Sequence, residues 1–393
     1  MDAPVRAQVA ATLATFATFG AFWGAWGASI ARLRDQAGVD EGELGIALLC
    51  IGAGALPAML AIGWILDRRG VQVAAHAIAA LGISGLLVAL TAHSFVSLAA
   101  SLVVVGMASG ASDVAMNALA GRAELASQRP VITRAHGALS GFVLLASLIT
   151  AGVAALELPV VIPFACVAVS AVMAAALVRR AVAMQPSPGT STADDVATSA
   201  TPALTTGLLA VLGVLGALAF ATEGAQQSWS AVFARDELDA SYGAAALAPA
   251  LFAAVVSATR LSIGHRASTH PGWLLAAGGI LAAAGSAVIA GATGWPVFVV
   301  GLVVAAAGSA VLFPTVLVMV SERVEEARRG RATSLVATVD YLGFLLGPAY
   351  VGAWADAYDL RVAMYAVAAL ALVLALATPA GVRTTRLTGR ARP

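Results

Sequence analysis

The sequence carries little charge and lacks lysine altogether. Only 11% of its 393 residues are charged, and all 22 basic residues are arginine. An ordinary soluble domain has about 25% charged residues, so the low charge excludes a soluble enzyme, a disordered chain and a protein with a basic face for nucleic acid. The basic residues nearly balance the 21 acidic ones, so no net charge attracts a polyanionic partner.

Other absences narrow the chemistry. The two cysteines, Cys50 and Cys166, lie in separate apolar runs, and we interpret them as small buried hydrophobic residues. No group of histidine, cysteine and carboxylate has metal-ligand spacing, so we expect no metal. A phosphate-binding GxxxxGK[ST] loop is also absent from the sequence, which argues against ATP hydrolysis by this chain. We therefore expect no cofactor other than an ion gradient as energy source.

Hydrophobic residues are abundant instead, at 60% of the chain, with a mean hydropathy of +0.90. A helix crosses a bilayer with about 20 apolar residues. The apolar runs predict an all-α membrane protein with twelve transmembrane helices. We expect these over 8–30, 44–65, 72–92, 97–120, 135–156, 159–179, 204–226, 242–263, 272–292, 295–320, 331–355 and 361–380. The first run is long and has no cleavage site after it, so we interpret it as a retained span.

The arginines predict the orientation of these spans, because cytoplasmic loops are enriched in basic residues. With the N-terminus inside, eighteen arginines fall in inside segments and four in outside loops. The four are Arg32, Arg34, Arg235 and Arg361. We therefore expect a multi-pass protein of the cytoplasmic membrane with both termini in the cytoplasm.

The chain divides into two halves. Residues 182–203 are rich in Ser, Thr and Pro, which is typical of a flexible linker. We expect six-helix bundles over 1–181 and 204–393, with a cytoplasmic linker over 182–203. The halves resemble each other at an offset of about 200 residues, where Arg122 aligns with Arg323. Parallel repeats of this kind are typical of secondary transporters.

A short motif follows the second predicted span, in the inside loop. It consists of Gly63, Asp67, Arg68 and Gly70 in the pattern G-x-x-x-D-R-x-G. Small residues there permit a tight turn, and the acid can meet a helix N-terminus or an arginine. This loop resembles the signature of the major facilitator superfamily, although Val71 and Gln72 replace its usual basic residues. The resemblance implies two six-helix bundles that work as a monomer.

Other stretches resemble a narrower group, the fucose-permease-like members and a bacterial inner-membrane branch of them. The resemblance covers nearly the whole chain but says little about substrate. It is carried by Asp113–Asn117, RAHGALSG at 134–141, Glu223–Ser230, Thr259–Arg260–Leu261 (with Thr in place of Gly) and Phe313–Pro314–Thr315.

Ionisable residues within spans are costly and indicate function. In the fourth span, Asp113 shares a helix face with Ser109 and Asn117, four residues away on either side. We hypothesise that Asp113 exchanges the coupling proton and that Asn117 contacts a polar substrate. The alternative is a structural hydrogen bond between helices.

In the seventh span, Glu223, Gln226 and Gln227 form a second polar face. We interpret it as a substrate or proton site; the alternative is a solvated outer mouth. In the eleventh span, Asp340 lies near the predicted midplane. It either binds substrate, takes part in gating, or pairs with an interior arginine, for which Arg260 is the candidate.

Aromatic residues and one histidine complete the candidates. Trp23 belongs to an aromatic stripe in the first span, and Trp229 lies in the seventh; each either contacts substrate or packs. His136 is either a proton relay or a simple interfacial residue. Asp67 with Arg122, and His265 with Arg323, are predicted to close the inner side in the outward-facing state.

These features favour a secondary transporter over other classes. A membrane enzyme needs a nucleophile and a base at one depth, and a receptor needs large polar domains; neither is found in the sequence. We predict proton-coupled symport of a small polar, sugar-like solute. The alternative is proton-antiport efflux of a drug or amphipathic metabolite. The expected partners are the solute and the lipid bilayer, without nucleic acid.

Overall fold

The computed structural model describes residues 2–184, 206–263, 270–323 and 326–389. Every regular element in these ranges is a helix. The first half contains α1 (Ala3–Ala37), α2 (Glu41–Arg69), α3 (Val73–Thr91), α4 (Phe95–Ser127), α5 (Val131–Ala155) and α6 (Val161–Ala183), with a 3-10 turn, η1, at Gly70–Gln72. The second half contains α7 (Thr206–Glu237), α8 (Tyr242–Ile263), α9 (Pro271–Ala290), α10 (Trp295–Ser309), α11 (Leu312–Arg323), α12 (Glu326–Ala357) and α13 (Leu360–Gly389). Each predicted span coincides with a helix, except that 295–320 is divided into α10 and α11.

Capping residues fix where several helices begin. Asp40 accepts a hydrogen bond from the backbone N–H of Glu43, and the Glu43 carboxylate accepts one from the N–H of Asp40. Ser94 and Ser97 form the same reciprocal arrangement at the start of α4. These capping boxes satisfy N–H groups that have no partner in the first helical turn.

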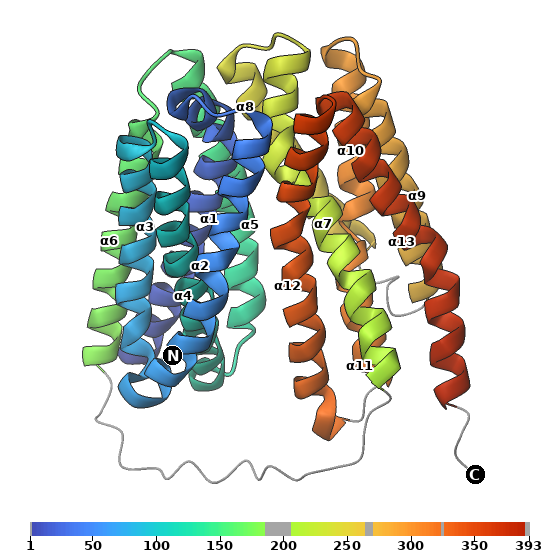
Figure 1. Ribbon diagram of the computed structural model, residues 1–393. Coiled ribbons are helices and arrows are strands. Elements are labelled where there is room, and N and C mark those ends of the chain that lie inside the picture. Colours follow the sequence, from blue (N-terminus) through green and yellow to red (C-terminus); the bar gives the residue numbers. More distant parts are fainter. Residues whose placement is uncertain (1, 185–205, 264–269, 324–325, 390–393) are drawn as a thin grey trace.

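The helices form two bundles side by side, α1 to α6 and α7 to α13 (Figure 1). Helix α1 begins and α13 ends at one end of the molecule, where α6 also ends and α7 begins (Figure 1). We name this end the linker side and the opposite end the distal side. Residues 182–184 of the predicted linker, 182–203, are described, at and just after the end of α6, and 185–203 lie outside the described residues.

Nine helical stretches in the described ranges are long and apolar enough to cross a membrane. One of them, Glu41–Thr91, contains both α2 and α3, and another, Trp295–Val320, contains α10 and most of α11. Helices α7 and α12 are not among the nine. The all-helical, multi-pass membrane fold is therefore confirmed, and the number of twelve spans stays a prediction.

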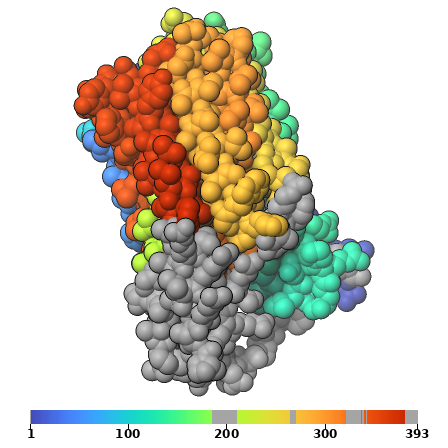
Figure 2. Space-filling view, turned by 90° about the vertical axis from the view of Figure 1, so that its right-hand side faces the viewer, coloured from blue at the N-terminus to red at the C-terminus, as the bar shows by residue number. Residues whose placement is uncertain are grey.

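The outer faces of the bundles are apolar. Helices α9 and α13 lie side by side on the face of the second half turned away from the first (Figure 2). Their exposed residues include Ile280, Leu281, Val373 and Leu376, as a lipid-facing surface requires. Cys166 was expected to be buried but is exposed. An apolar run in a membrane helix has a lipid-facing side as well as a buried one, and Cys166 lies on an exposed side.

Within each bundle, glycines let helix backbones approach closely. A Cβ atom at Gly106 of α4 would overlap the carbonyl oxygen of Ile51 in α2. A Cβ atom at Gly343 of α12 would likewise overlap the carbonyl oxygen of Ala217 in α7. Small residues at helix contacts are the usual means of packing in membranes, where apolar side chains gain little by leaving lipid.

The two bundles meet on the distal side. There Gly45 of α2 packs on Gly352 of α12, and Gly243 of α8 packs on Ala155 of α5. Toward the linker side, large apolar residues on the inner helices are exposed: Leu60 is 82% exposed and Leu261 is 87% exposed. The described parts of the two bundles are therefore in close contact on the distal side, which we call closed, and leave these two residues uncovered toward the linker side.

Candidate functional site

A cavity of about 370 Å³ lies between the two bundles. Its volume is within the range of about 300–1,000 Å³ that small-molecule sites occupy. Residues of α1, α2, α4 and α5 line it from the first half, and residues of α7, α8 and α12 line it from the second. Both bundles thus contribute to the wall.

Aromatic rings form much of this wall. They are Phe19, Trp23 and Trp26 of α1, Phe220 of α7, Phe252 of α8 and Phe344 of α12. The ring centroids of Phe220 and Phe344 are 6.0 Å apart in an edge-on arrangement, and Phe220 also lies 4.1 Å from Phe313 of α11. The predicted contact residue Trp23 is therefore in the cavity wall, as part of an aromatic surface that both bundles build.

The part of the cavity wall that the second half supplies contains an ion pair. Nη2 of Arg260 lies 3.1 Å from Oε1 and 3.0 Å from Oε2 of Glu223. Gln227 donates to the same carboxylate at 3.2 Å, from one turn further along α7. The Glu223 side chain is 7% exposed and that of Arg260 is 39% exposed. In this conformation the Glu223 carboxylate is therefore buried and paired, which favours the site interpretation over a solvated outer mouth.

The Arg260 guanidinium also contacts the backbone at the break between α10 and α11. Its Nε donates to the carbonyl oxygen of Ala310 at 2.9 Å. Pro314 lies four residues after Ala310 and has no N–H to satisfy that carbonyl. The guanidinium takes the place of the missing backbone donor, in the manner of the interrupted helices found at transporter sites.

On the N-terminal wall, Asp113 lines the cavity beside Ser109 and Gly110. Asn117 donates from Nδ2 to the carbonyl oxygen of Asp113 at 2.9 Å and to its Oδ1 at 3.3 Å. Asn117 is not among the lining residues. In this conformation its amide therefore orients the carboxyl rather than facing the cavity.

Three predicted site residues of the second half lie off the cavity. Gln226 is buried and donates to Ser286 Oγ of α9 at 2.9 Å. Trp229 is buried and donates from Nε1 to the Pro348 carbonyl oxygen at 3.1 Å. Asp340 is completely buried and is not a lining residue.

The predicted partner of Asp340 also differs. Arg260 pairs with Glu223, so the hypothesised Asp340–Arg260 pair is wrong in this conformation. The helix periodicity of α7 and α12 does not fix their rotation about their own axes, and that rotation decided the pairing.

The loop motif lies at the linker side. Gly70 has φ +68° and closes α2, which explains the glycine because other residues are strained there. The Arg68 guanidinium stacks over the Trp64 ring at 3.5 Å. A Cβ atom at Gly63 would meet open space.

The predicted inner gate is not formed in this conformation. Asp67 and Arg122 are both exposed, and no ion pair joins them. The side chain of Arg323 and all of His265 lie outside the described residues. His136 is exposed and packs edge-on against the Phe16 ring, with centroids 5.0 Å apart.

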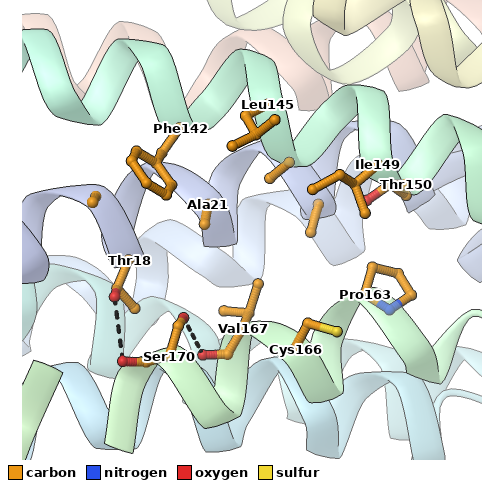
Figure 3. Close-up of a pocket in the computed structure, with 13 residues that line it drawn as sticks. Thr18, Ala21, Phe142, Leu145, Ile149, Thr150, Pro163, Cys166, Val167 and Ser170 are labelled. Carbon is orange, nitrogen blue, oxygen red and sulfur yellow. Dashed lines mark hydrogen bonds between the residues drawn. The ribbon is translucent and has the colours of Figure 1, made fainter. Parts of the chain in front are cut away.

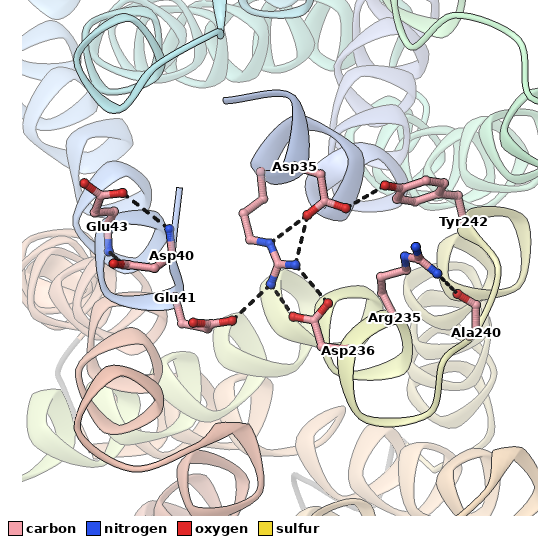
Figure 4. Close-up of polar contacts among 9 residues, drawn as sticks. Asp35, Asp40, Glu41, Glu43, Arg235, Asp236, Ala240 and Tyr242 are labelled. Atoms are coloured by element: carbon pink, nitrogen blue, oxygen red, sulfur yellow. Dashed lines mark hydrogen bonds and ion pairs between the residues drawn. The ribbon is translucent and has the colours of Figure 1, made fainter. Parts of the chain in front are cut away.

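Sequence reasoning missed a polar network on the distal side, drawn in Figure 4. Arg34 of α1 forms ion pairs with Asp236 of α7 and Glu41 of α2. Nη2 of Arg34 also lies 2.8 Å from Asp236 Oδ1, and Tyr242 of α8 donates to Asp35 Oδ2 at 2.6 Å (Figure 4). These contacts join the two bundles, and we name them the distal latch. In the sequence, these contacts were indicated only by two clusters of charged residues, at 32–43 and 235–239, far apart in the chain.

A smaller crevice of about 170 Å³ lies between α1, α5 and α6 (Figure 3). Its labelled wall includes Phe142, Leu145, Ile149 and Cys166, all of which are exposed. Its lining is mostly apolar and includes no charged residue. The central cavity is therefore the candidate functional site.

Comparisons with known proteins agree with this architecture. The family model of the Major Facilitator Superfamily matches residues 212–391. A curated MFS-type transporter of Yersinia pestis, itself uncharacterized, is 28% identical over 352 residues, which cover 88% of each protein.

Solved structures show the same fold. A bacterial homolog to the human lysosomal transporter Spinster, in an inward-facing and unoccupied conformation, aligns with a TM-score of 0.84 and 14% identity over 100% of both chains. The nucleoside transporter NupG aligns with a TM-score of 0.78 and 14% identity, over 96% of this chain and 99% of that one. A D-xylose-proton symporter aligns with a TM-score of 0.72 and 15% identity, over 93% and 96% of the two chains.

These findings confirm the resemblance to the major facilitator superfamily: its family model matches most of the second half of the chain, and an MFS-type transporter is similar along most of the chain. The narrower resemblance to fucose-permease-like members stays a prediction.

Proposed function

We propose that the chain is a proton-coupled symporter that moves a small polar, sugar-like solute across the cytoplasmic membrane by alternating access. The observation that carries this proposal is one cavity with Asp113 on the wall of one bundle and the Glu223–Arg260 pair on the wall of the other. A solute that contacts both walls links the two bundles. A proton on Asp113 changes the affinity of the cavity for this solute.

The arginine distribution supports a cytoplasmic location for the linker side. A structure closed on the distal side is then the inward-facing one, ready to release solute to the cytoplasm. The distal latch holds this state. Leu60 and Leu261, exposed toward the linker side, would be covered when the bundles close there.

The cavity wall suits a ring that carries hydroxyl groups. Aromatic side chains stack on the apolar face of such a ring, and Ser140, Ser147 and Ser257 add hydroxyls to the wall. Arg260 lines the cavity, and its side chain is 39% exposed. The D-xylose-proton symporter and the nucleoside transporter of similar fold carry names of this substrate class, which supports the proposal without extending their substrates to this chain.

Asp113 is the proposed proton carrier for the solute site. It lines the cavity and its carboxyl accepts a hydrogen bond from Asn117. The Glu223 carboxylate is held by Arg260 and by Gln227. No cofactor enters this cycle, because the proton gradient supplies the energy. The bilayer is the surrounding partner, and we propose that the chain acts as a monomer, since both walls come from one chain.

Proton-antiport efflux of an amphipathic compound is the second candidate. The lining contains two acids, Asp113 and Glu223, and one cation, Arg260, among largely apolar residues. An excess of one negative charge in an apolar cavity favours a cationic amphipathic solute that competes with a proton.

Transport by the purified protein in proteoliposomes with an internal pH-sensitive dye tests the proposal. We expect a sugar-like solute to acidify the lumen when it enters, and Asp113→Asn to abolish proton-driven accumulation while leaving solute exchange. Asp239→Asn is the control, because Asp239 lies off the cavity at φ +50°, which asparagine tolerates. Counter-flow of protons with an amphipathic cation would establish efflux instead. Accumulation unchanged in Asp113→Asn would remove the role of Asp113.

A further inference from the structure

Asp340 of α12 is a buried acid that the proposed transport cycle does not yet use. It is 0% exposed, and neither of its carboxyl oxygens has a hydrogen-bond partner in the described part of the chain. Gly216 of α7 lies directly opposite, since a Cβ atom there would overlap Asp340 Oδ1. The carboxyl is therefore enclosed at the contact between α7 and α12, outside the solute cavity.

No described ionisable side chain offers this carboxyl a partner. Helix α7 has no titratable residue between Thr206 and Thr222, and its first acid, Glu223, is paired with Arg260. On the other helices packed against α12, the described titratable groups belong to residues near the helix ends or on the opposite bundle. They are Arg361 and Tyr365 of α13 and Glu41, Glu43, Cys50, Asp67, Arg68 and Arg69 of α2. On α12 itself, Tyr350 and Asp356 lie toward its distal end. The side chains of Glu322 and Arg323 in α11, of 326–335 and Tyr341 in α12, and of Arg383 and Arg386 in α13 lie outside the described residues.

Burial and the lack of partners decide the charge of Asp340. An ionised carboxylate without hydrogen bonds or a counter-ion is far more costly to bury than the neutral acid. Asp340 in this packing is compatible with the protonated form and strongly opposed to the ionised one. A conformational change that admits water between α7 and α12 would remove the difference in cost between the ionised and the neutral carboxyl.

We propose that Asp340 is a second protonation site, separate from the solute cavity, whose proton stabilises the conformation that is closed on the distal side. This inference rests on the proposed alternating access. It adds to the transport cycle a second proton, which changes the balance between the two conformations and does not contact the solute. Loss of the proton disfavours the enclosed α7–α12 contact, and so favours the opposite conformation.

Helix α12 is placed to transmit this effect. Leu345 and Gly352 of α12 pack on Gly52 and Gly45 of α2, across the boundary between the bundles. Phe344, one helical turn from Asp340, lines the cavity, and Pro348 lies inside the same helix. A proline inside a helix removes a backbone hydrogen bond and permits bending. When the bundles part on the distal side, α12 loses its contact with α2 and is free to move against α7.

Distance measurements between spin labels, without solute or gradient, test this proposal. Labels at His93→Cys and Tyr358→Cys, both exposed in distal loops of different bundles, would be attached in full-length protein in which Cys50 and Cys166 are replaced by serine. Raising the pH from about 5.5 to about 8.5 should lengthen the distal distances. The ratio of the two populations should change by up to about tenfold per pH unit, the limit for one linked proton.

The Asp340→Asn protein should keep the short distal distance at all pH values, because asparagine cannot ionise. Asp340→Ala serves as a second neutral variant if the asparagine protein does not fold. Asp239→Asn is the matched control and should retain the pH response, because Asp239 lies off the cavity. A wild-type distance that does not change with pH, or a full response in the Asp340 variants, would overturn the proposal. Because no solute is present, failure of the symport assay and failure of this inference are distinguishable.

Discussion

Arg260 donates from Nε to the carbonyl oxygen of Ala310, 2.9 Å away, at the break between α10 and α11. The same guanidinium reaches Glu223 through Nη2. A proline four residues after Ala310 thus creates the acceptor that orients the only described cation in the cavity wall. Backbone and ion pair together fix the side of Arg260 that faces solute.

Pro314→Ala is predicted to weaken solute binding. Alanine supplies a backbone N–H that can bond to the Ala310 carbonyl, and Arg260 then loses a charged hydrogen bond worth about 2 kcal/mol. Binding measured by isothermal titration should weaken by about tenfold or more. Pro57→Ala is the control, because Pro57 is also inside a helix but is exposed and does not line the cavity. Equal effects of both substitutions would contradict a specific role for Ala310.

Glu223→Gln is predicted to abolish solute binding without preventing folding. The amide keeps the size of the side chain but leaves the partly buried Arg260 without its counter-ion, and such losses cost about 2–5 kcal/mol of binding. Arg260→Gln in the same protein removes the leftover charge, so the double variant should be more stable to heat than Glu223→Gln alone. Wild-type transport by Glu223→Gln would rule out this pair as part of the site.

Asp236→Asn is predicted to shift the protein toward the conformation open on the distal side. The substitution removes an anionic partner of Arg34, whose side chain is only 11% exposed, and a charged hydrogen bond of this kind contributes about 2 kcal/mol. Labels on the two distal loops should report an increase of about tenfold or more in the population with separated bundles.

Glu237→Gln provides the matched control for the distal latch. Glu237 pairs with Arg361 at 2.6 Å, but both residues belong to the second bundle. Loss of this pair should lower heat stability slightly and leave the distance between the bundles unchanged. A similar shift in both variants would mean that charge loss alone, and not the contact between bundles, moves the equilibrium.

Gly106→Ala and Gly121→Ala, both in α4, are predicted to have opposite effects on stability. A Cβ atom at Gly106 would overlap the Ile51 carbonyl oxygen, whereas one at Gly121 would meet nothing within 4 Å. The first substitution should destabilise the fold by about 1–3 kcal/mol, and the second should leave it unchanged or stabilise it through helix propensity. Thermal unfolding in detergent measures both, and a stable Gly106→Ala protein would refute the close α2–α4 contact.

The sequence by itself determined the helices and their membrane character, because apolar runs and capping residues act locally. It also indicated Asp113, Glu223 and Arg260, since an ionisable residue in an apolar run can be recognised without knowing how its helix is oriented. Gly70 was recognisable for a similarly local reason, because a small residue in a short loop permits a tight turn, and the structure places it at φ +68° where α2 ends.

Tertiary structure alone decided which of these residues meet. It paired Arg260 with Glu223 instead of Asp340, placed Trp229 and Gln226 off the cavity, and joined Arg34 to Asp236 across two bundles. Periodicity gives the faces of a helix but not its rotation or depth relative to neighbours distant in the chain. Those are set by close packing at positions such as Gly216 and Gly343, where the fit between two surfaces, and not the pattern of either one, fixes the contact.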